Sequence, residues 1–298
     1  MIFDFTIKFF WPKDDEMKKL NKLEALEKRN ELVEFGFTTV PTVMPKPLVQ
    51  QLRIWSDNIL DRVAIDRKIR YQGSDIFVHT ERRWGENGKE RKPNHFPDSI
   101  AEKIIDLPLQ KEVCELIGLE NLNPDDLVII LSKPGYGPPL YWHQDFMKWN
   151  SPEAATPWPT RVFLSYYLTD TNRQNGCLRA IPGTHRRRHL LHDILPDAHS
   201  AEIQSIDDLS HPAFADYPDA VDVPMKAGDL LIADARLMHA AWPNQTKHRR
   251  TLLLAWHEVF SFPHPPSWWT EPVPEVIKNA SKSHEVSANS RTPTDYIQ

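Results

Sequence analysis

Five short hydrophobic segments, separated by turn-forming residues, follow one another from residue 125 onward in this 298-residue chain. Runs of this length that are rich in Val, Ile, Leu, Phe and Tyr are typical of buried β-strands. We predict strands over 127–133, 161–169, 177–181, 229–234 and 251–259. So many short strands must bury their sheets against each other or against helices, which favours a β-sandwich or a barrel.

Amphipathic helical patterns precede these strands. The first covers 14–35, where Asp14 or Asp15 can cap the helix and Gly36 ends it. Its apolar stripe consists of Met17, Leu20, Leu23, Leu26 and Val33. Helices followed by short strands predict a mixed α+β, mainly β fold in which N-terminal helices flank the β core.

The other segments give weaker patterns. We expect a strand over 37–43, a helix with prolines in its first turn over about 45–66, and a further helix near 98–117. The segment 70–98 is mixed and polar. The segment 183–220 is long and rich in His, Asp and Arg, and we interpret it as an excursion of the kind that often forms a lid.

These patterns predict a single domain over residues 1–298. It consists of a helical N-terminal part over 14–117, a β core over about 125–260 and a Pro- and Ser-rich tail over 261–298. The composition of the tail favours extended chain.

Composition excludes several classes of function. A formal net charge of −5 argues against a nucleic-acid partner. The two cysteines, Cys114 and Cys177, are far apart in sequence and predict neither a disulfide framework nor a thiolate zinc site. We find no signal peptide and no apolar run long enough to cross a membrane, so we expect a cytoplasmic protein with no membrane partner. The surplus of 13 histidines favours imidazole and carboxylate chemistry. Oligomeric state is left open.

The most informative motif is His143-Gln144-Asp145. Side chains two residues apart at a strand end point the same way and can bind one metal ion. His239 follows another predicted strand, and two His with one carboxylate form the facial triad of non-heme Fe(II) oxygenases. Either histidine taken alone is equally explained as a buried structural residue.

Arginine 250 extends this pattern. A 2-oxo acid can occupy two of the open metal positions, and its distal carboxylate then needs a bidentate cation. On the predicted strand, Arg250 shares a face with Leu252 and Leu254, whereas Arg249 points the other way. Alternation alone does not decide which face points inward.

Other polar and aromatic residues have two readings each. Arg161 and Arg179 lie on predicted core strands, where a buried cation needs a partner, so we consider them candidates for binding a substrate carboxylate. Trp149 either walls the substrate pocket or packs beneath it. The basic run 186–188 is either a phosphate site or a solvated loop. We interpret His79-Thr80-Glu81 as a loop.

Several motifs appear in an order that resembles the phytanoyl-CoA dioxygenase family of Fe(II)/2-oxoglutarate oxygenases. They are Lys133-Pro134-Gly135 before Trp142-His143-Gln144-Asp145, Asn175-Gly176-Cys177-Leu178 before Ile181-Pro182-Gly183-Thr184-His185, and Gly228-Asp229 before His239, Asn244 and Arg250. The resemblance covers roughly residues 30–258.

The resemblance implies a double-stranded β-helix (jelly-roll or cupin-like) core. It implies His143, Asp145 and His239 as iron ligands, and Arg250 as the residue that holds 2-oxoglutarate. The family often has Ser or Thr where this chain has Ala241, so either Thr246 or Ser165 substitutes in binding the cosubstrate or Arg250 acts alone. Related halogenases have a small residue at the position of Asp145, so the carboxylate favours hydroxylation or another oxidation over halogenation.

The function that follows is a dioxygenase that uses Fe(II), 2-oxoglutarate and O₂. It would hydroxylate an unactivated C–H bond of a small-molecule substrate, a small organic compound or natural product, and release succinate and CO₂. Two alternatives remain. One is a cupin-like metalloenzyme that uses the same triad without 2-oxoglutarate, and the other is a non-catalytic jelly-roll binding module.

Overall fold

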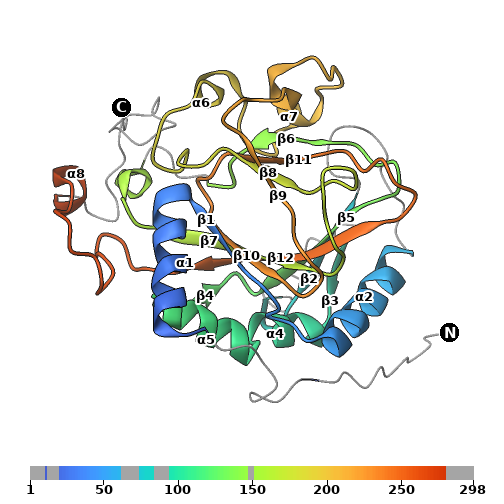
Figure 1. The fold of residues 1–298 in the computed structure, drawn as a ribbon, viewed down its shortest axis with the longest axis horizontal. Helices are drawn as coiled ribbons and strands as arrows, with labels where there is room; N and C mark the ends of the chain where they lie inside the picture. The colour runs from blue at the N-terminus through green and yellow to red at the C-terminus, as the bar shows by residue number, and fades with distance from the viewer. Residues whose placement is uncertain (1–10, 12–19, 62–73, 84–93, 147–150, 280–298) are drawn as a thin grey trace.

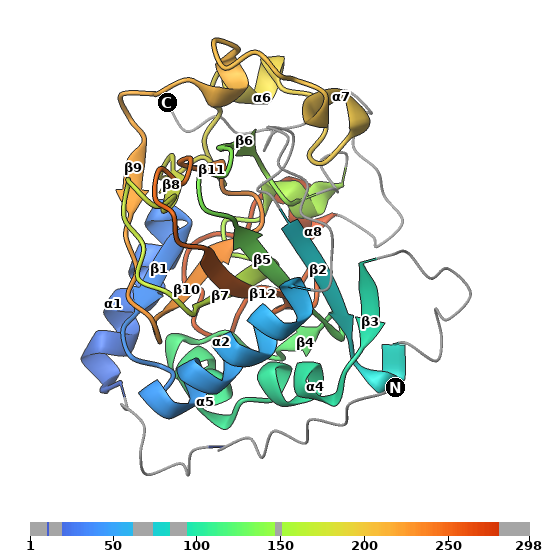
Figure 2. The ribbon, with the colours of Figure 1, turned by 90° about the vertical axis from the view of Figure 1, so that its right-hand side faces the viewer.

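Two β-sheets form the centre of the molecule, and helices cover one of them (Figures 1 and 2). The computed structural model describes residue 11 and residues 20–61, 74–83, 94–146 and 151–279. The large sheet has the strand order β1-β10-β7-β12-β5-β2-β3, with β4 paired to β12. Its strands are β1 (Phe37–Val40), β2 (Ser74–His79), β3 (His95–Pro97), β4 (Asn123–Pro124), β5 (Leu127–Lys133), β7 (Arg161–Tyr167), β10 (Leu230–Asp234) and β12 (Arg250–Glu258).

The small sheet has the order β6-β11-β8-β9. Its strands are β6 (Leu140–His143), β8 (Leu178–Ala180), β9 (Val221–Val223) and β11 (His239–Ala241). A mixed α+β fold dominated by sheets is therefore confirmed. All five strands predicted from residue 125 onward are present, and the strand over 127–133 has the predicted bounds.

Alternation along the strands of the large sheet separates two cores. On β12, Leu253 belongs to the cluster that the helices cover, whereas Leu252 and Leu254 belong to the cluster on the other face. On β5, Val128 and Ile130 face the helices in the same way. Because successive side chains point to opposite faces, each strand contributes to both clusters.

Four helices pack on the outer face of the large sheet (Figure 2). They are α1 (Lys22–Phe35), α2 (Lys46–Leu60), α4 (Ser99–Ile105) and α5 (Pro108–Ile117). The helix expected near 98–117 is thus two helices, because the chain breaks at Asp106 and Leu107 and Pro108 starts a new first turn.

The predicted start of the first helix is wrong. Helix α1 begins at Lys22, and Asn21 caps it by accepting hydrogen bonds from the amides of Leu23 and Glu24. Asp14, Asp15 and Met17 lie outside the described residues. The predicted stripe is also wrong in part, since Leu23 and Leu26 are exposed. Ala25 and Leu32 are buried instead, because α1 contacts both β1 and α5.

The polar segment 70–98 contains two strands that its composition did not reveal. Strand β2 pairs with β5 and buries Ile76 and Val78, and β3 continues the sheet beyond it. The loop predicted at 79–81 is therefore wrong at its start, because His79 ends β2. The His79 Nε2 lies 2.8 Å from His95 Nδ1, at the edge of the large sheet.

The excursion over 183–220 lies across the small sheet and appears at the top of Figures 1 and 2. It contains α6 (Leu191–Ile194), α7 (Ala201–Gln204) and the short 3-10 helix η3 (Pro212–Phe214). A second 3-10 helix, η2 (Pro152–Ala155), precedes β7. Buried Leu191, Ile203 and Ala213 pack the excursion onto β6 and β11, so this long connection is an ordered layer.

The predicted extended tail is wrong for residues 261–279. The Trp268 indole donates a hydrogen bond to the Gly118 carbonyl at 2.7 Å, and Ile277 of helix α8 (Glu275–Lys278) is buried. Trp269 stacks edge-on against Trp158. Trp268 and Trp269 in this proline-rich run favour packing of the tail onto the domain, but composition alone does not indicate their partners, which are distant in sequence.

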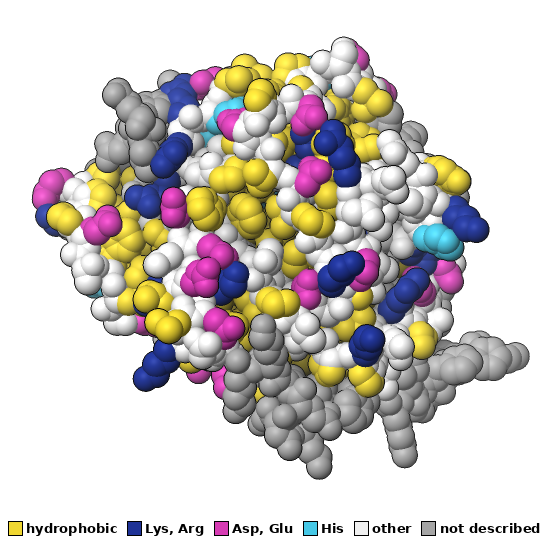
Figure 3. All heavy atoms as spheres, in the orientation of Figure 1, with side chains coloured by type: hydrophobic (Ala, Val, Ile, Leu, Met, Phe, Trp, Pro, Cys, Tyr) yellow, Lys and Arg dark blue, Asp and Glu magenta, His cyan; other side chains and the backbone are white. Residues whose placement is uncertain are grey.

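Two further observations concern the surface. Among the described residues, no helix is long and apolar enough to span a bilayer. On the face shown in Figure 3, basic and acidic side chains are interspersed.

Candidate active site

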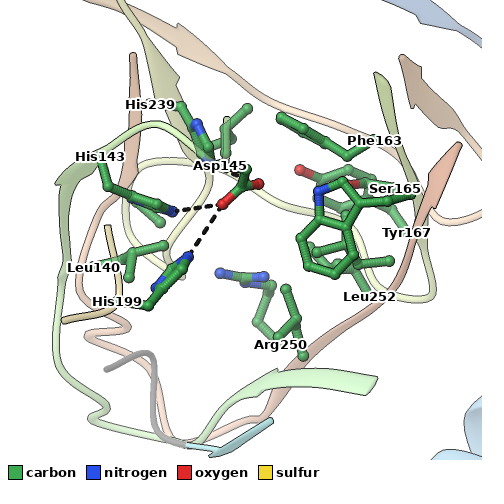
Figure 4. Close-up of a pocket in the computed structure, with 15 residues that line it drawn as sticks. Leu140, His143, Asp145, Phe163, Ser165, Tyr167, His199, His239, Arg250 and Leu252 are labelled. Atoms are coloured by element: carbon green, nitrogen blue, oxygen red, sulfur yellow. Dashed lines mark hydrogen bonds and ion pairs between the residues drawn. The ribbon is translucent and has the colours of Figure 1, made fainter. Parts of the chain in front are cut away.

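A pocket of about 500 Å³, open to solvent, lies between the two sheets (Figure 4). Both sheets and the excursion contribute to its walls. The lining residues are Leu131, Leu140, His143, Asp145, Phe163, Ser165, Tyr167, Leu178, His199, His239, Ala241, Arg250, Leu252, Leu254 and Trp256. Apolar walls with a few convergent polar groups are typical of small-molecule sites.

Two of the predicted histidines face each other across the small sheet. His143 ends β6, His239 begins β11, and the two residues are paired in register. The Nδ1 of His143 donates to the Tyr141 carbonyl at 3.0 Å, and the Nδ1 of His239 donates to the Leu237 carbonyl at 2.9 Å. These bonds place the proton on Nδ1 of each ring, which leaves the Nε2 lone pair available to a metal ion.

The carboxylate of Asp145 lies between these rings, as Figure 4 shows. Its Oδ1 is 3.6 Å from His143 Nε2, and its Oδ2 is 3.9 Å from His239 Nε2. The period-two argument therefore placed His143 and Asp145 correctly on one side of the chain. The structure brings all three predicted triad residues into one buried cluster.

Electrostatics give these groups the protonation states that metal binding needs. Burial lowers the pKa of both His143 and His239, so both imidazoles are neutral at physiological pH. Burial alone raises the pKa of Asp145, but the hydrogen bond from His199 and the neighbouring imidazoles outweigh it and hold the pKa below its usual range. Two neutral imidazoles and one carboxylate form a donor set that fits divalent iron.

His199 is a member of this cluster that the sequence did not indicate. It comes from the excursion, and ligand atoms of His143, Asp145 and His199 lie within 4.8 Å of one another. Its Nε2 is 3.1 Å from Asp145 Oδ1. The excursion's length and histidine content were the only signals, because an irregular segment has no periodicity that would select one side chain.

Arg250 points into the pocket (Figure 4) and is buried. The neighbouring Arg249 points to the other face and forms ion pairs with Asp57 at 2.9 Å and Asp61 at 3.0 Å. The structure thus resolves which face of the strand is inward. Burial lowers the pKa of Arg250, and its Nε has no hydrogen-bond partner among the described residues.

The glycine of the Asn175-Gly176 motif makes room for a lysine beside Arg250. Lys133 pairs with Arg250 in register between β5 and β12, and its side chain is fully buried. A Cβ added at Gly176, where φ is +90°, would lie 2.7 Å from Lys133 Cδ. Burial and the charge of Arg250 lower the pKa of Lys133 well below its usual range. This motif therefore acts through packing.

Ser165 and Thr246 were the two residues expected to supply the hydroxyl that Ala241 lacks, and only one of them lies in the pocket. Ser165 on β7 lines the pocket together with Ala241. Thr246 does not line it, which corrects that expectation. The Thr246 hydroxyl donates to Asn244 Oδ1 at 2.8 Å, and Asn244 in turn donates to the Pro134 carbonyl at 3.0 Å. Thr246 thus belongs to a turn held by Asn244.

The arginines considered for substrate binding are not brought to the pocket. Arg161 pairs with Asp125 at the end of β7. Arg179 pairs with Asp216, and its guanidinium lies 3.7 Å from the centre of the Trp242 ring. Each cation has an acidic partner distant in sequence, which strand position alone does not reveal. Trp149 lies outside the described residues.

His185 and the basic run beside it have packing roles. The buried His185 donates from Nε2 to the Val33 carbonyl at 3.0 Å, at the end of α1. A Cβ at Gly36 would lie 2.6 Å from the His185 ring. Arg186 also donates to the Val33 carbonyl, and Arg188 pairs with Asp193, so these contacts favour the structural reading of the run over a phosphate site.

Comparisons with known proteins agree with this site. The chain matches phytanoyl-CoA dioxygenase (PhyH) over residues 32–252, and it belongs to this family. It is 28% identical over 158 residues to an ectoine dioxygenase of Bordetella parapertussis, which covers 49% of this chain and 49% of that protein. The chain thus spans about half the length of these curated relatives.

Solved structures share the fold. The α-ketoglutarate-dependent carbocyclase SnoK from nogalamycin biosynthesis has a TM-score of 0.57 at 18% identity, covering 84% of this chain and 91% of that chain. The epimerase SnoN, in complex with Fe³⁺, α-ketoglutarate and nogalamycin RO, has a TM-score of 0.55 at 19% identity, covering 80% and 84%. At this identity the likeness concerns the fold.

Proposed function

We propose that the protein is a mononuclear non-heme Fe(II), 2-oxoglutarate-dependent dioxygenase. His143, Asp145 and His239 are its iron ligands, and Arg250 binds the distal carboxylate of 2-oxoglutarate. We also propose that the two facing sheets form a double-stranded β-helix, the fold that the resemblance implies. Family membership and the likeness to enzymes that use iron and α-ketoglutarate support this assignment.

The observation that carries the proposal is that Arg250 is buried without an acidic partner among the described residues. Its guanidinium is buried in the same pocket as the triad, and no described carboxylate lies within ion-pair distance. A buried cation without a counterion is unfavourable by several kcal/mol, on the order of 2–5, and an anionic ligand relieves this. Arg249 is paired with two aspartates, so the described part of the chain supplies acids to one arginine and none to the other.

The residues of the pocket have distinct roles in this reaction. Bound iron, with 2-oxoglutarate and O₂, supplies the oxidising power to hydroxylate an unactivated C–H bond, with release of succinate and CO₂. The Nε2 atoms of His143 and His239 and an oxygen of Asp145 bind the metal ion. Arg250 orients the cosubstrate, and the apolar walls exclude water from the reacting atoms. Phe163 and Trp256 contribute to those walls.

The proposed substrate is a small organic compound or natural product. The apolar lining of the pocket, from residues such as Leu140, Phe163 and Leu252, favours a substrate with an apolar body. Relatives of the chain are named ectoine dioxygenase and phytanoyl-CoA dioxygenase, which agrees with a small-molecule substrate. Retention of the carboxylate at Asp145 supports hydroxylation as the outcome.

The test is anaerobic loading with Fe(II) and 2-oxoglutarate, followed through the metal-to-ligand absorption band. We expect a band in the wild-type protein and a 2-oxoglutarate Kd raised about 30-fold or more in Arg250→Ala, because truncating a buried ion-pair partner costs about 2–5 kcal/mol. Arg249→Ala is the matched control and should keep the wild-type Kd. An unchanged Kd in Arg250→Ala would reject the role of Arg250, and the absence of a band in the wild-type protein would favour a metalloenzyme that uses the triad without 2-oxoglutarate.

A further inference from the structure

The histidine that the excursion adds to the site makes two hydrogen bonds. His199 Nε2 contacts Asp145 Oδ1 at 3.1 Å, and His199 Nδ1 contacts the Tyr141 hydroxyl at 3.0 Å. Figure 4 shows the ring beside Asp145, opposite His239. His199 and Asp145 are 54 residues apart in sequence, so the excursion and the segment that follows strand β6 meet at this contact.

The direction of these bonds follows from the chemistry of the partners. An ionised carboxylate only accepts hydrogen bonds, so Nε2 of His199 must carry the proton and donate to Asp145. Nδ1 is then the acceptor in a neutral ring, and the Tyr141 hydroxyl donates to it. The lone pair of His199 is therefore directed toward Tyr141 and away from Asp145.

This arrangement distinguishes His199 from the two proposed iron ligands. His143 and His239 donate from Nδ1 to backbone carbonyls, which turns their Nε2 lone pairs toward the site. His199 presents an N–H to the site instead. A metal ligand must offer a lone pair, and hydrogen-bond donors to a ligating carboxylate orient it and tune its binding.

The backbone around His199 holds the ring in place. His199 has φ +57°, in the left-handed region that non-glycine residues seldom occupy. The Gln204 side chain donates to the His199 carbonyl at 2.8 Å, and the Ser200 side chain caps α7. A residue kept in a sparsely populated conformation by several contacts is typical of functional sites.

We propose that His199 is a positioning residue for Asp145, an inference that rests on the proposed function. It holds one carboxylate oxygen by hydrogen bonding and leaves the other to bind iron, while Tyr141 fixes the tautomer of His199. Through this bond the excursion over 183–220 is tied to the metal centre.

The experiment measures Fe(II) affinity by anaerobic titration in the wild type, His199→Ala, His199→Gln, Tyr141→Phe and His143→Ala. We expect a Kd for iron raised about 10–100-fold in His199→Ala, as is usual when a partner of a metal ligand is removed. His199→Gln should recover part of this loss, because its amide can donate to Asp145. Tyr141→Phe should show a smaller loss of the same kind.

His211→Ala is the matched control. His211 is also in the excursion, where its side chain accepts a hydrogen bond from the amide of Ala213 at 3.1 Å, and it does not line the pocket. Thermal melting of the metal-free proteins checks that each variant is folded. Iron affinity in His211→Ala should equal that of the wild type.

Two outcomes would overturn the inference and leave the proposed function intact. An unchanged iron Kd in His199→Ala would show that the bond to Asp145 has no positioning effect. A loss as complete as in His143→Ala, with no recovery in His199→Gln, would make His199 a ligand. Failure of the wild-type protein to bind iron would instead reject the proposed function.

Discussion

The two faces of the large sheet bury similar numbers of apolar side chains but treat polar groups differently. On the face covered by helices, polar groups find partners within the protein: the Tyr166 hydroxyl donates to Gln110 of α5, and Gln110 also contacts His257. On the face toward the small sheet, Arg250 is buried without an acidic partner among the described residues.

The difference shows how one set of strands builds both a core and a site. Buried cations are normally paired with an acid, so one that is not indicates where an anionic ligand belongs. Burial alone does not make this distinction, because His185 and His143 are both buried with lowered pKa values. The neighbours of each side chain separate the two roles: His185 contacts a backbone carbonyl of α1, whereas His143 lies beside Asp145 in the pocket.

The largest expected effect on stability concerns adjacent leucines of β12. Leu253 is fully buried on the helix-covered face, so Leu253→Ala should lower the free energy of unfolding by about 2–5 kcal/mol. Leu252 lines the pocket, and Leu252→Ala should cost less because part of its surface faces open space. Urea unfolding measures both, and equal losses would contradict the distinction between the faces.

A smaller effect concerns His185, which packs against the end of α1. Burial lowers its pKa to about 4, opposed by the charge of Asp234, against about 6.5 in the unfolded chain. The unfolded state therefore takes up a proton first as the pH falls. The stability due to neutral His185 is fully present above about pH 6.5 and is lost progressively toward pH 4, by up to about 3 kcal/mol.

Urea unfolding at pH 7.5 and pH 4.5 tests this dependence in the wild type and in His185→Phe. The loss of stability between the two pH values should be smaller in the variant, because the phenyl ring takes up no proton. His79 and His257, whose pKa values burial also lowers to about 4, titrate in both proteins. Identical pH dependence in the two proteins would reject a packing role for neutral His185.

The smallest expected effect concerns the hydroxyls near Ala241. Ser165 lines the pocket, so Ser165→Ala should raise the Kd for 2-oxoglutarate by up to about tenfold, the value of one hydrogen bond. Thr246→Ala should leave this Kd unchanged, since Thr246 bonds to Asn244 in a turn. Titration of the absorption band in both variants measures the difference, and a reversed order would contradict the assignment.

Much of the β core was predictable because its strands are long apolar runs with turn residues between them. The strand over 127–133 and the position of the His143 and Asp145 pair follow from local pattern alone. Strands β2 and β3 could not be predicted from local pattern, because their segment is polar. It forms strands because β2 pairs with β5 and β3 pairs with β2. The start of α1 was also wrong, because a better cap, Asn21, lies nearer the buried turns.

The sequence by itself determined which residues can carry the chemistry, because period-two alternation and motif spacing are local. It identified His143, Asp145 and His239. It also placed Arg249 and Arg250 on opposite faces of one strand, without showing which of the two points inward. Only the tertiary structure decided that choice, removed Arg161, Arg179 and Thr246 from the site, and added His199. Ion pairs and hydrogen bonds between distant segments form only when the chain is folded, and no local pattern specifies them.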